Sequence, residues 1–564
     1  MKKGRGRGHR ETAGGRASKP GTGAQGRTAR GGLPALEGGV AILLTALALI
    51  LMSRFLTHAG PLWRDEVNSV EFARMSGLSE IARNLRFDGF PLLSTLALRG
   101  WMSLGLGATD LGLRAYGFLI GVAFLAALWF TSRRLGCRTP LLALALVGLS
   151  PWAVSTMASI RPYGIGMVFL TLTLGAVWAA TEAGTMRRWL TAGALAILSV
   201  QCMYQNAILL LGMGVAAILA ALLAGRRGAA LGVTLVGLGA ALSLLPYVPN
   251  IAAARDWNVV IQVPTGWGQL LSTLRIAASG GPPLAEWPWV AAALASLYLG
   301  YRSLGQKPKH GAAAPDAPNV AFFAATLLVV TTAVFLLALK STRLPTEPWY
   351  YVPLLVAVIP ALDAAIAASF TSVAPRAARL GLVLVVALSA SVFAWRQLAE
   401  RRTNLDRVAA HLAANAVEGD AVIVSPVYYG VAFQRYYKGP ARWMTLPPLD
   451  ETRIHRYDLV KAAMTRTDAV QPAIQAMSEA LASGHRVWLV GGLPDPGPNA
   501  AAALPVAPSG PMGWYCGPYF VGWGRQASYM LSQHALRGEP VSVPIHGPVN
   551  PYENVPMVVV SGWK

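Results

Sequence analysis

Long runs of apolar residues alternate with short polar connections over most of this chain. A helix that crosses a bilayer takes about 20 apolar residues, and eleven runs come close to that length or exceed it. The pattern therefore predicts a polytopic α-helical membrane protein with about eleven transmembrane helices. The runs are residues 38–56, 112–132, 140–157, 163–181, 189–205, 206–224, 229–249, 285–301, 319–339, 350–369 and 379–396.

A twelfth run, residues 90–106, is shorter and is interrupted by Arg99. If it does not cross, all five basic connections between the spans fall on the side of the N-terminus. If it does cross, they fall on the opposite side, against the rule that short cytoplasmic loops are rich in Lys and Arg. We therefore predict that 90–106 lies at the membrane surface, that the N-terminus is cytoplasmic, and that the chain after residue 396 is outside.

Composition supports this interpretation. The chain has 564 residues, of which 54% are hydrophobic and 13% charged, whereas soluble domains carry about 25% charged residues. The net charge is +22, and part of it comes from the Gly- and Arg-rich segment 1–37. We predict that this segment is a disordered cytoplasmic tail rather than a nucleic-acid-binding segment. The three cysteines are far apart, which excludes a disulfide scaffold and a cysteine-based zinc site.

The last third of the chain, residues 397–564, has the pattern of a globular domain. Helical periodicity alternates with short β-branched runs between Pro- and Gly-rich loops, which predicts an extracytoplasmic α/β domain. The predicted elements are a helix at 405–417, a strand at 420–425, a helix at 471–483, a strand at 486–491 and a last strand at 555–560.

Polar and aromatic residues gather in the connections predicted to face the outer side. Acids directly after the first span are costly at the interface unless they are paired or functional. Arginine binds phosphate in a bidentate manner, aromatic faces suit a sugar ring or a prenyl chain, and a carboxylate takes a proton from an attacking hydroxyl. The candidates are Trp63, Asp65, Glu66, Asp88, Arg161, Tyr163, Arg343, Glu347, Trp349 and Tyr350.

Each candidate also has a structural interpretation. In this interpretation, Asp65 forms an interfacial ion pair with Arg64, and Arg161 extends to the membrane surface. Asp88 then caps a turn, and the aromatic residues form a membrane-interface belt. The sequence contains no D-x-D, P-loop, H-E-x-x-H or G-x-S-x-G motif. We therefore expect neither a metal-bridged nucleotide-sugar site nor any required cofactor.

Several short segments resemble the GT-C glycosyltransferases related to protein mannosyltransferases and to the lipid A aminoarabinose transferase. Residues 63–74 (WRDEVNSVEFAR) are similar to the family's first-loop signature. Further similarities are a Pro-containing stretch at 89–93, the turn into the second span at 107–114, the R-x-Y at 161–163, a late helix at 352–360 and the start of a C-terminal extracytoplasmic domain at 419–437.

The resemblance implies an inverting transfer from a polyprenyl-phosphate sugar. It assigns the role of base to Asp65, with Glu66 beside it, and makes Arg114 and Arg161 candidates to hold the donor phosphate. The chain departs from the family by having Ser159 rather than an acid before R-x-Y, and Tyr350-Tyr351 rather than Arg-Tyr in the late helix. Arg343 is the candidate to replace that arginine.

The expected function is sugar transfer to a cell-envelope glycolipid, polysaccharide or protein on the outer side of the bacterial inner membrane. The sequence does not distinguish among these acceptors and does not name the sugar. The alternatives are a lipid or sugar transporter (a flippase) with an accessory outer domain, and a non-catalytic assembly factor.

Overall fold

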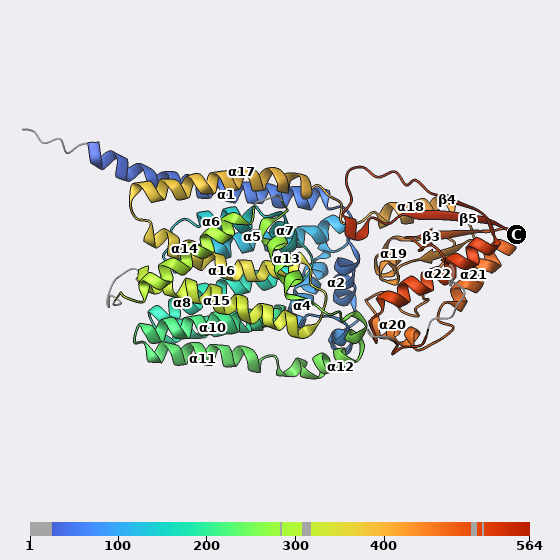
Figure 1. Ribbon diagram of the computed structural model, residues 1–564, viewed down its shortest axis with the longest axis horizontal. Helices are drawn as coiled ribbons and strands as arrows, with labels where there is room; N and C mark the ends of the chain where they lie inside the picture. The colour runs from blue at the N-terminus through green and yellow to red at the C-terminus, as the bar shows by residue number, and fades with distance from the viewer. Residues whose placement is uncertain (1–24, 282–284, 307–316, 498–504, 510–512) are drawn as a thin grey trace, which may run out of the picture.

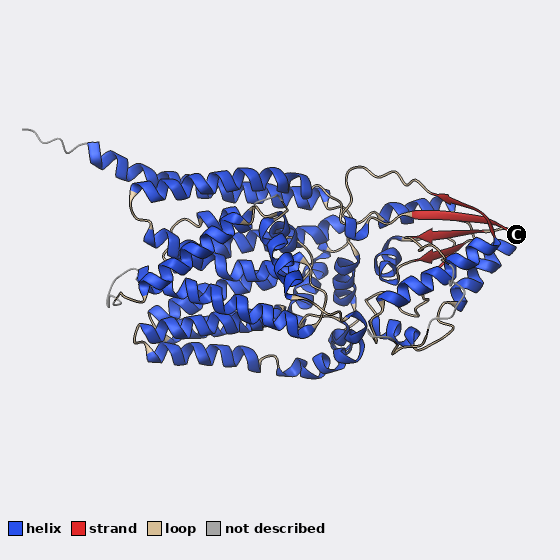
Figure 2. Ribbon diagram, viewed as in Figure 1, coloured by secondary structure: helices blue, strands red, loops and turns tan. Residues whose placement is uncertain are grey.

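The computed structural model describes residues 25–281, 285–306, 317–497, 505–509 and 513–564. The molecule is elongated: a bundle of long helices forms one end, and a domain with a β-sheet forms the other (Figures 1 and 2). Helices α1 and α17 lie side by side along one edge of the bundle. The helices of the bundle are α1 (Gln25–His58), α5 (Asp110–Arg134), α8 (Tyr163–Glu182), α9 (Met186–Cys202), α10 (Gln205–Leu223), α11 (Arg227–Leu242), α14 (Trp287–Ser303), α15 (Ala317–Thr342), α16 (Pro348–Ser369) and α17 (Val373–Gln397).

Eight helices in the described parts of the chain are long and apolar enough to cross a membrane. Large apolar side chains on the outside of the bundle are exposed, as at Ile42, Leu235 and Leu388, and such a surface suits lipid rather than water. Helix α16 is mostly buried and is apolar on every side, as expected for a central helix. The chain is thus a multi-pass membrane protein.

The other three predicted spans differ from these eight. Helices α9 and α14 are apolar but have 17 residues each, and a total of eleven spans stays a prediction. The expectation of one helix over 140–157 was wrong, because this segment consists of α6 (Leu141–Ala143), a π-helical turn η3 (Leu144–Gly148) and α7 (Pro151–Met157). Pro151 disfavours a helical conformation at Ser150, whose hydroxyl instead caps α7 by accepting a hydrogen bond from the Ala153 N–H.

Helix α1 begins at Gln25, so the prediction of disorder over 1–37 was wrong for residues 25–37. Residues 1–24 of that predicted tail lie outside the described residues. Within this helix Glu37, which is 5% exposed, forms an ion pair with Arg376 of α17. The Arg376 Nε donates to Glu37 Oε1 at 3.1 Å.

The first loop forms a layer of short helices at the end of the bundle that faces the C-terminal domain (Figure 1). Arg99, which interrupts the apolar run 90–106, donates hydrogen bonds to the carbonyls of Ala73 and Met75 and so ties α4 to α2. The surface position of α4 in a membrane stays a prediction. The short elements between the long helices are α2 (Arg64–Arg74), α3 (Leu78–Asn84), η1 (Leu85–Phe87), α4 (Leu92–Trp101), η2 (Met102–Leu106), η4 (Leu245–Tyr247), α12 (Val248–Asn258), η5 (Val259–Ile261) and α13 (Trp267–Ser279).

The C-terminal domain contains a five-stranded mixed sheet with the order β2-β1-β3-β5-β4. Strand β1 is parallel to β2 and β3, whereas β5 is antiparallel to β3 and β4. Alternate residues of β1 face opposite sides: Val422 packs toward α18 and Ile423 toward α21. The strands are β1 (Ala421–Val424), β2 (Arg442–Thr445), β3 (Arg486–Val490), β4 (Ala535–Pro540) and β5 (Met557–Trp563).

The predicted elements of this domain are largely present. The structure has α18 (Leu405–Asn415), β1, α21 (Gln471–Ala482) and β3 close to the predicted positions, whereas β5 begins two residues later than predicted and extends to Trp563. Strands β2 and β4 were not predicted. Helices and turns that were also not predicted are η6 (Val427–Tyr429), α19 (Gly430–Tyr436), α20 (Tyr457–Met464), α22 (Gly517–His534) and η7 (Pro551–Glu553).

Candidate functional site

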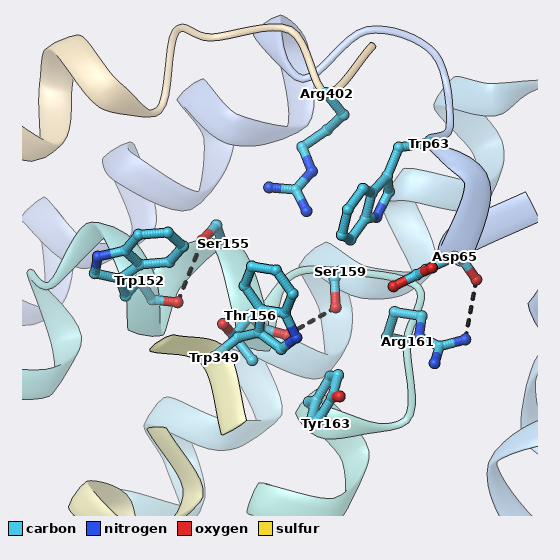
Figure 3. A pocket seen from close by; sticks show the side chains of 10 residues that line it. All are labelled: Trp63, Asp65, Trp152, Ser155, Thr156, Ser159, Arg161, Tyr163, Trp349 and Arg402. Atoms are coloured by element: carbon cyan, nitrogen blue, oxygen red, sulfur yellow. Dashed lines mark hydrogen bonds between the residues drawn. The ribbon is translucent and has the colours of Figure 1, made fainter. Parts of the chain in front are cut away.

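A cavity lies where the first loop, the broken segment before α8 and the start of the C-terminal domain meet (Figure 3). It holds about 360 Å³ of empty space, including solvent at its mouth. Its walls combine one carboxylate, two arginines, four aromatic rings and the hydroxyl groups of two serines and a threonine. The lining residues are Trp63, Asp65, Trp152, Ser155, Thr156, Ser159, Arg161, Tyr163, Trp349 and Arg402.

Local sequence explains why these side chains converge. Asp65 lies in the first turn of α2, where the helix dipole stabilises a carboxylate. Arg161 precedes Pro162, which disfavours the helical conformation before it, so the chain turns there between α7 and α8. Trp349 follows Pro348, which occupies the first position of α16.

Asp65 is held in an electropositive setting and its side chain is 27% exposed. Its Oδ1 lies 3.2 Å from Nε2 of His455. Burial opposes ionisation, but the hydrogen bond from His455 and the charges of Arg161 and Arg64 together outweigh it, and the pKa of Asp65 is lowered well below its usual value. The carboxylate is therefore ionised at neutral pH.

Arg161 links α2 to the opposite wall of the cavity. Its Nη1 donates to the backbone carbonyl of Asp65 and to Ser69 Oγ, both at 3.0 Å, and the guanidinium lies 4.7 Å from the ring centre of Phe90. Nε of Arg161 is buried without a hydrogen-bond partner among the described residues. Asp88 is also buried near Arg161, and burial raises its pKa against the attraction of that arginine.

Arg402 extends into the cavity from the segment after α17 (Figure 3). Its guanidinium lies 4.5 Å from the ring centre of Trp63. Burial and the charge of Arg114 lower the pKa of Arg402, against the attraction of Glu66 and Asp65. In the described part of the chain neither Arg402 nor Arg161 forms an ion pair with a carboxylate, so both retain donors for an anion.

Aromatic rings form the apolar part of the wall. Trp349 lies at the centre of this cluster, with ring centres 5.8 Å from Trp63, 6.2 Å from Trp152 and 5.3 Å from Tyr552. Tyr163 lies 6.1 Å from Tyr350. Such faces suit the apolar surface of a sugar ring.

Comparisons with known proteins give a match for the fold. No protein-family model and no curated protein matches the sequence. Among solved structures, ArnT from Cupriavidus metallidurans bound to undecaprenyl phosphate aligns with a TM-score of 0.53 and 13% identity, covering 92% of this chain and 98% of that one. The two chains share a fold. The predicted likeness to GT-C glycosyltransferases is confirmed at this level.

Two other GT-C structures align with scores below 0.5. The Archaeoglobus fulgidus oligosaccharyltransferase, tethered to an acceptor peptide, has a TM-score of 0.42 and 11% identity, covering 94% of this chain and 74% of that one. Mycobacterial arabinofuranosyltransferase AftD has a TM-score of 0.38 and 16% identity, covering 92% of this chain and 41% of that one. These scores are too low to add to the fold assignment.

Five of the predicted residues line one cavity: Trp63, Asp65, Arg161, Tyr163 and Trp349. Three more lie close to it. Tyr350 contacts Tyr163 and Trp349, Asp88 lies near Arg161, and Glu347 accepts a hydrogen bond of 2.7 Å from the hydroxyl of Tyr552.

Glu66 and Arg114 lie behind the cavity wall as a buried pair. Two nitrogens of Arg114 donate to the two carboxylate oxygens of Glu66, each at 3.1 Å. The same guanidinium donates to the carbonyls of Gly60 and Pro61 at 2.7 Å. Its side chain is 2% exposed, so the structure directs Arg114 at the first loop and not into the cavity.

Arg343 is separate from the site. It is exposed, and its backbone carbonyl accepts a hydrogen bond from the N–H of Val263 at 2.8 Å. The side chain does not line the cavity. Arg402, rather than Arg343, is the second arginine that lines the cavity, beside the aromatic cluster.

Sequence reasoning missed Arg402 and His455. A signal for Arg402 was present, because Arg401 and Arg402 follow the last apolar run at its predicted outer end, where few basic residues are expected. His455 carries no such signal, since it is a single histidine 390 positions from Asp65. Trp152 was hidden inside a run that we interpreted as one continuous span.

Proposed function

We propose that this protein is an inverting glycosyltransferase of the outer face of the bacterial inner membrane, with its N-terminus cytoplasmic. It moves a sugar from a polyprenyl-phosphate donor to a cell-envelope glycolipid, polysaccharide or protein. One observation carries the proposal: Asp65 shares a cavity at the end of a membrane bundle with Arg161 and Arg402, neither of which is ion-paired among the described residues. The fold shared with an undecaprenyl phosphate-bound transferase supports a lipid-phosphate donor.

The proposed reaction follows from this geometry. The acceptor hydroxyl attacks the anomeric carbon on the face opposite the phosphate, and its proton passes to the carboxylate of Asp65. The bond between the anomeric carbon and the phosphate oxygen breaks, and its electron pair remains on the lipid phosphate. Arg161 and Arg402 stabilise that negative charge. The products are the inverted glycoside, polyprenyl phosphate and a protonated Asp65, which returns its proton to solvent.

A second cavity offers a place for the lipid chain. It is lined mainly by apolar side chains of η3, α13, α14 and α17, including Leu146 and Val385. Ser150 and Pro151 line it, whereas Trp152, the next residue, lines the first cavity. The two cavities thus have lining residues that are consecutive at the start of α7, and we propose that the prenyl chain of a donor whose phosphate lies near Arg161 and Arg402 extends toward these apolar walls.

We also propose that transfer needs no divalent metal, because two arginines supply the positive charge that the leaving phosphate requires. Activity is therefore expected to persist in the presence of a chelator such as EDTA. Loss of activity in EDTA, restored by Mg²⁺ or Mn²⁺, would contradict this part of the proposal.

The test is a transfer assay with the full-length protein in nanodiscs. A panel of polyprenyl-phosphate sugars is supplied with a membrane extract as acceptor, and release of polyprenyl phosphate is measured. We expect turnover of one donor, with a loss of about 10²–10⁴-fold in Asp65→Asn and none in the matched control Asp468→Asn, whose carboxylate is exposed. Absence of turnover with every donor, together with donor flux across liposomes, would instead favour a transporter.

A further inference from the structure

Among the described residues, the C-terminal domain forms one hydrogen bond to the carboxylate of Asp65, and it comes from His455. His455 lies in the segment before α20, and its Nε2 is 3.2 Å from Asp65 Oδ1. The imidazole is 14% exposed. Because Asp65 is ionised, it accepts the hydrogen bond and Nε2 carries the hydrogen.

Three separate elements fix the position of this ring. The side chain of Asn68 in α2 accepts a hydrogen bond of 3.0 Å from the backbone N–H of His455. The imidazole stacks on Tyr457, with ring centres 6.0 Å apart. Tyr457 in turn stacks on Trp257 of α12 at 5.7 Å. Both partners of the Asp65–His455 contact are therefore held by their surroundings.

The domain itself is attached to the first loop on both sides of Asp65. The Tyr436 hydroxyl accepts a hydrogen bond of 2.6 Å from the N–H of Leu62 and donates to Asp110 at 2.8 Å. Arg64 pairs with Glu553 at 3.1 Å. These contacts hold the C-terminal domain against the helix that carries the proposed base.

We propose that His455 is a positioning residue of the transfer reaction: it orients the Asp65 carboxylate and, by its own protonation state, controls how readily that carboxylate accepts a proton. This inference rests on the proposed function. A neutral imidazole holds Oδ1 and leaves Oδ2 free for the acceptor hydroxyl. A cationic imidazole stabilises the carboxylate further and makes it a weaker base.

The surroundings of His455 decide how its protonation acts. His455, Arg64 of α2 and Arg161 of the turn before α8 all act on the carboxylate of Asp65. His455 and Arg161 also act on Asp88 in the segment after η1, while Arg456 and Tyr457 are the neighbours of His455 in sequence. A cationic His455 adds to the positive charge of Arg64 and Arg161 around one carboxylate. Protonation of the ring should therefore weaken the base, and the transfer rate is expected to decline toward acid pH.

The test compares His455→Gln, His455→Ala and the control His546→Gln, whose side chain is exposed in the C-terminal domain. Gln retains an N–H donor for Asp65 but does not titrate, whereas Ala removes both properties. The kcat/KM for transfer from the donor that the wild type uses is measured between pH 5 and 9. Folded protein is quantified by size-exclusion chromatography and thermal melting.

We expect His455→Ala to lose about 10- to 100-fold on the alkaline side of the profile, which is the scale of misplacing a catalytic group. His455→Gln should retain most of the alkaline rate and lose the acid decline, and His546→Gln should behave as the wild type. Normal rates in His455→Ala, or an unchanged acid decline in His455→Gln, would overturn this inference and leave the proposed function standing. Absence of wild-type turnover would overturn both.

Discussion

Arg161 donates its hydrogen bond to the backbone carbonyl of Asp65, at 3.0 Å, and not to the carboxylate of that residue. The guanidinium is thus fixed on the helix that carries the proposed base while the side chain of Asp65 stays available. Its charge still contributes to the low pKa of the carboxylate. One arginine therefore affects both the proposed phosphate site and the proposed base.

Replacing Arg161 with Ala is expected to change both properties. The KM for the donor should rise about 10- to 100-fold, because a hydrogen bond to a charged group contributes about 1.5–3 kcal/mol. Removing the positive charge should also raise the pKa of Asp65, so the base form is lost at a higher pH than in the wild type. The pH dependence of kcat/KM checks this, and an unchanged donor KM would exclude Arg161 from phosphate binding.

Replacing Arg402 with Ala should be a cleaner test of the anion site. Arg402 has no ion-pair partner among the described residues, so its removal leaves no carboxylate without its partner. We expect a donor KM about 10- to 100-fold higher with a melting temperature close to that of the wild type. Arg525→Ala, on the exposed face of α22, is the control. Equal kinetics for the two variants would contradict the assignment of Arg402.

Much of the fold was predictable because membranes impose simple rules. A helix satisfies its own backbone in lipid, so long apolar runs identify α1, α5, α8 and α15 directly. The break at Ser150 is different, because apolarity continues through it and only Pro151 indicates a new helix start. In the C-terminal domain β1 and β3 are buried runs, whereas β4 is mostly exposed and has no apolar pattern to detect.

The candidate site was predictable only where its chemistry is local in sequence. Asp65 and Arg161 are polar residues at the ends of apolar spans, and this position makes them conspicuous. Pairs of residues that are far apart in sequence cannot be recognised in this way. Glu66 pairs with Arg114, 48 positions away, and Asp65 with His455, 390 positions away. The resemblance suggested phosphate binding for Arg114, but burial with Glu66 and two carbonyls directs it elsewhere.

Glu66 and Arg114 give a prediction about stability. Arg114→Met should destabilise the protein by about 3–5 kcal/mol, because it leaves Glu66 as an uncompensated buried charge. Combining Arg114→Met with Glu66→Gln should recover part of this loss, since the variant then contains no buried charge at the site. Thermal melting in nanodiscs checks both variants. A folded Arg114→Met protein with normal stability and a raised donor KM would instead support phosphate binding by Arg114.

Glu553 predicts how stability depends on pH. The side chain is fully buried beside Arg64, and burial, which outweighs the attraction of that arginine, raises its pKa from 4.5 to about 7. A carboxyl group with a raised folded-state pKa stabilises the fold fully below its unfolded pKa, and this contribution is lost as the pH rises through the folded pKa. The free energy of unfolding should therefore decrease between about pH 4.5 and 7, by no more than about 1.4 kcal/mol per pH unit. Melting curves should show this decline for the wild type and for the exposed control Glu539→Gln, but not for Glu553→Gln. The same slope in Glu553→Gln would show that another group is responsible.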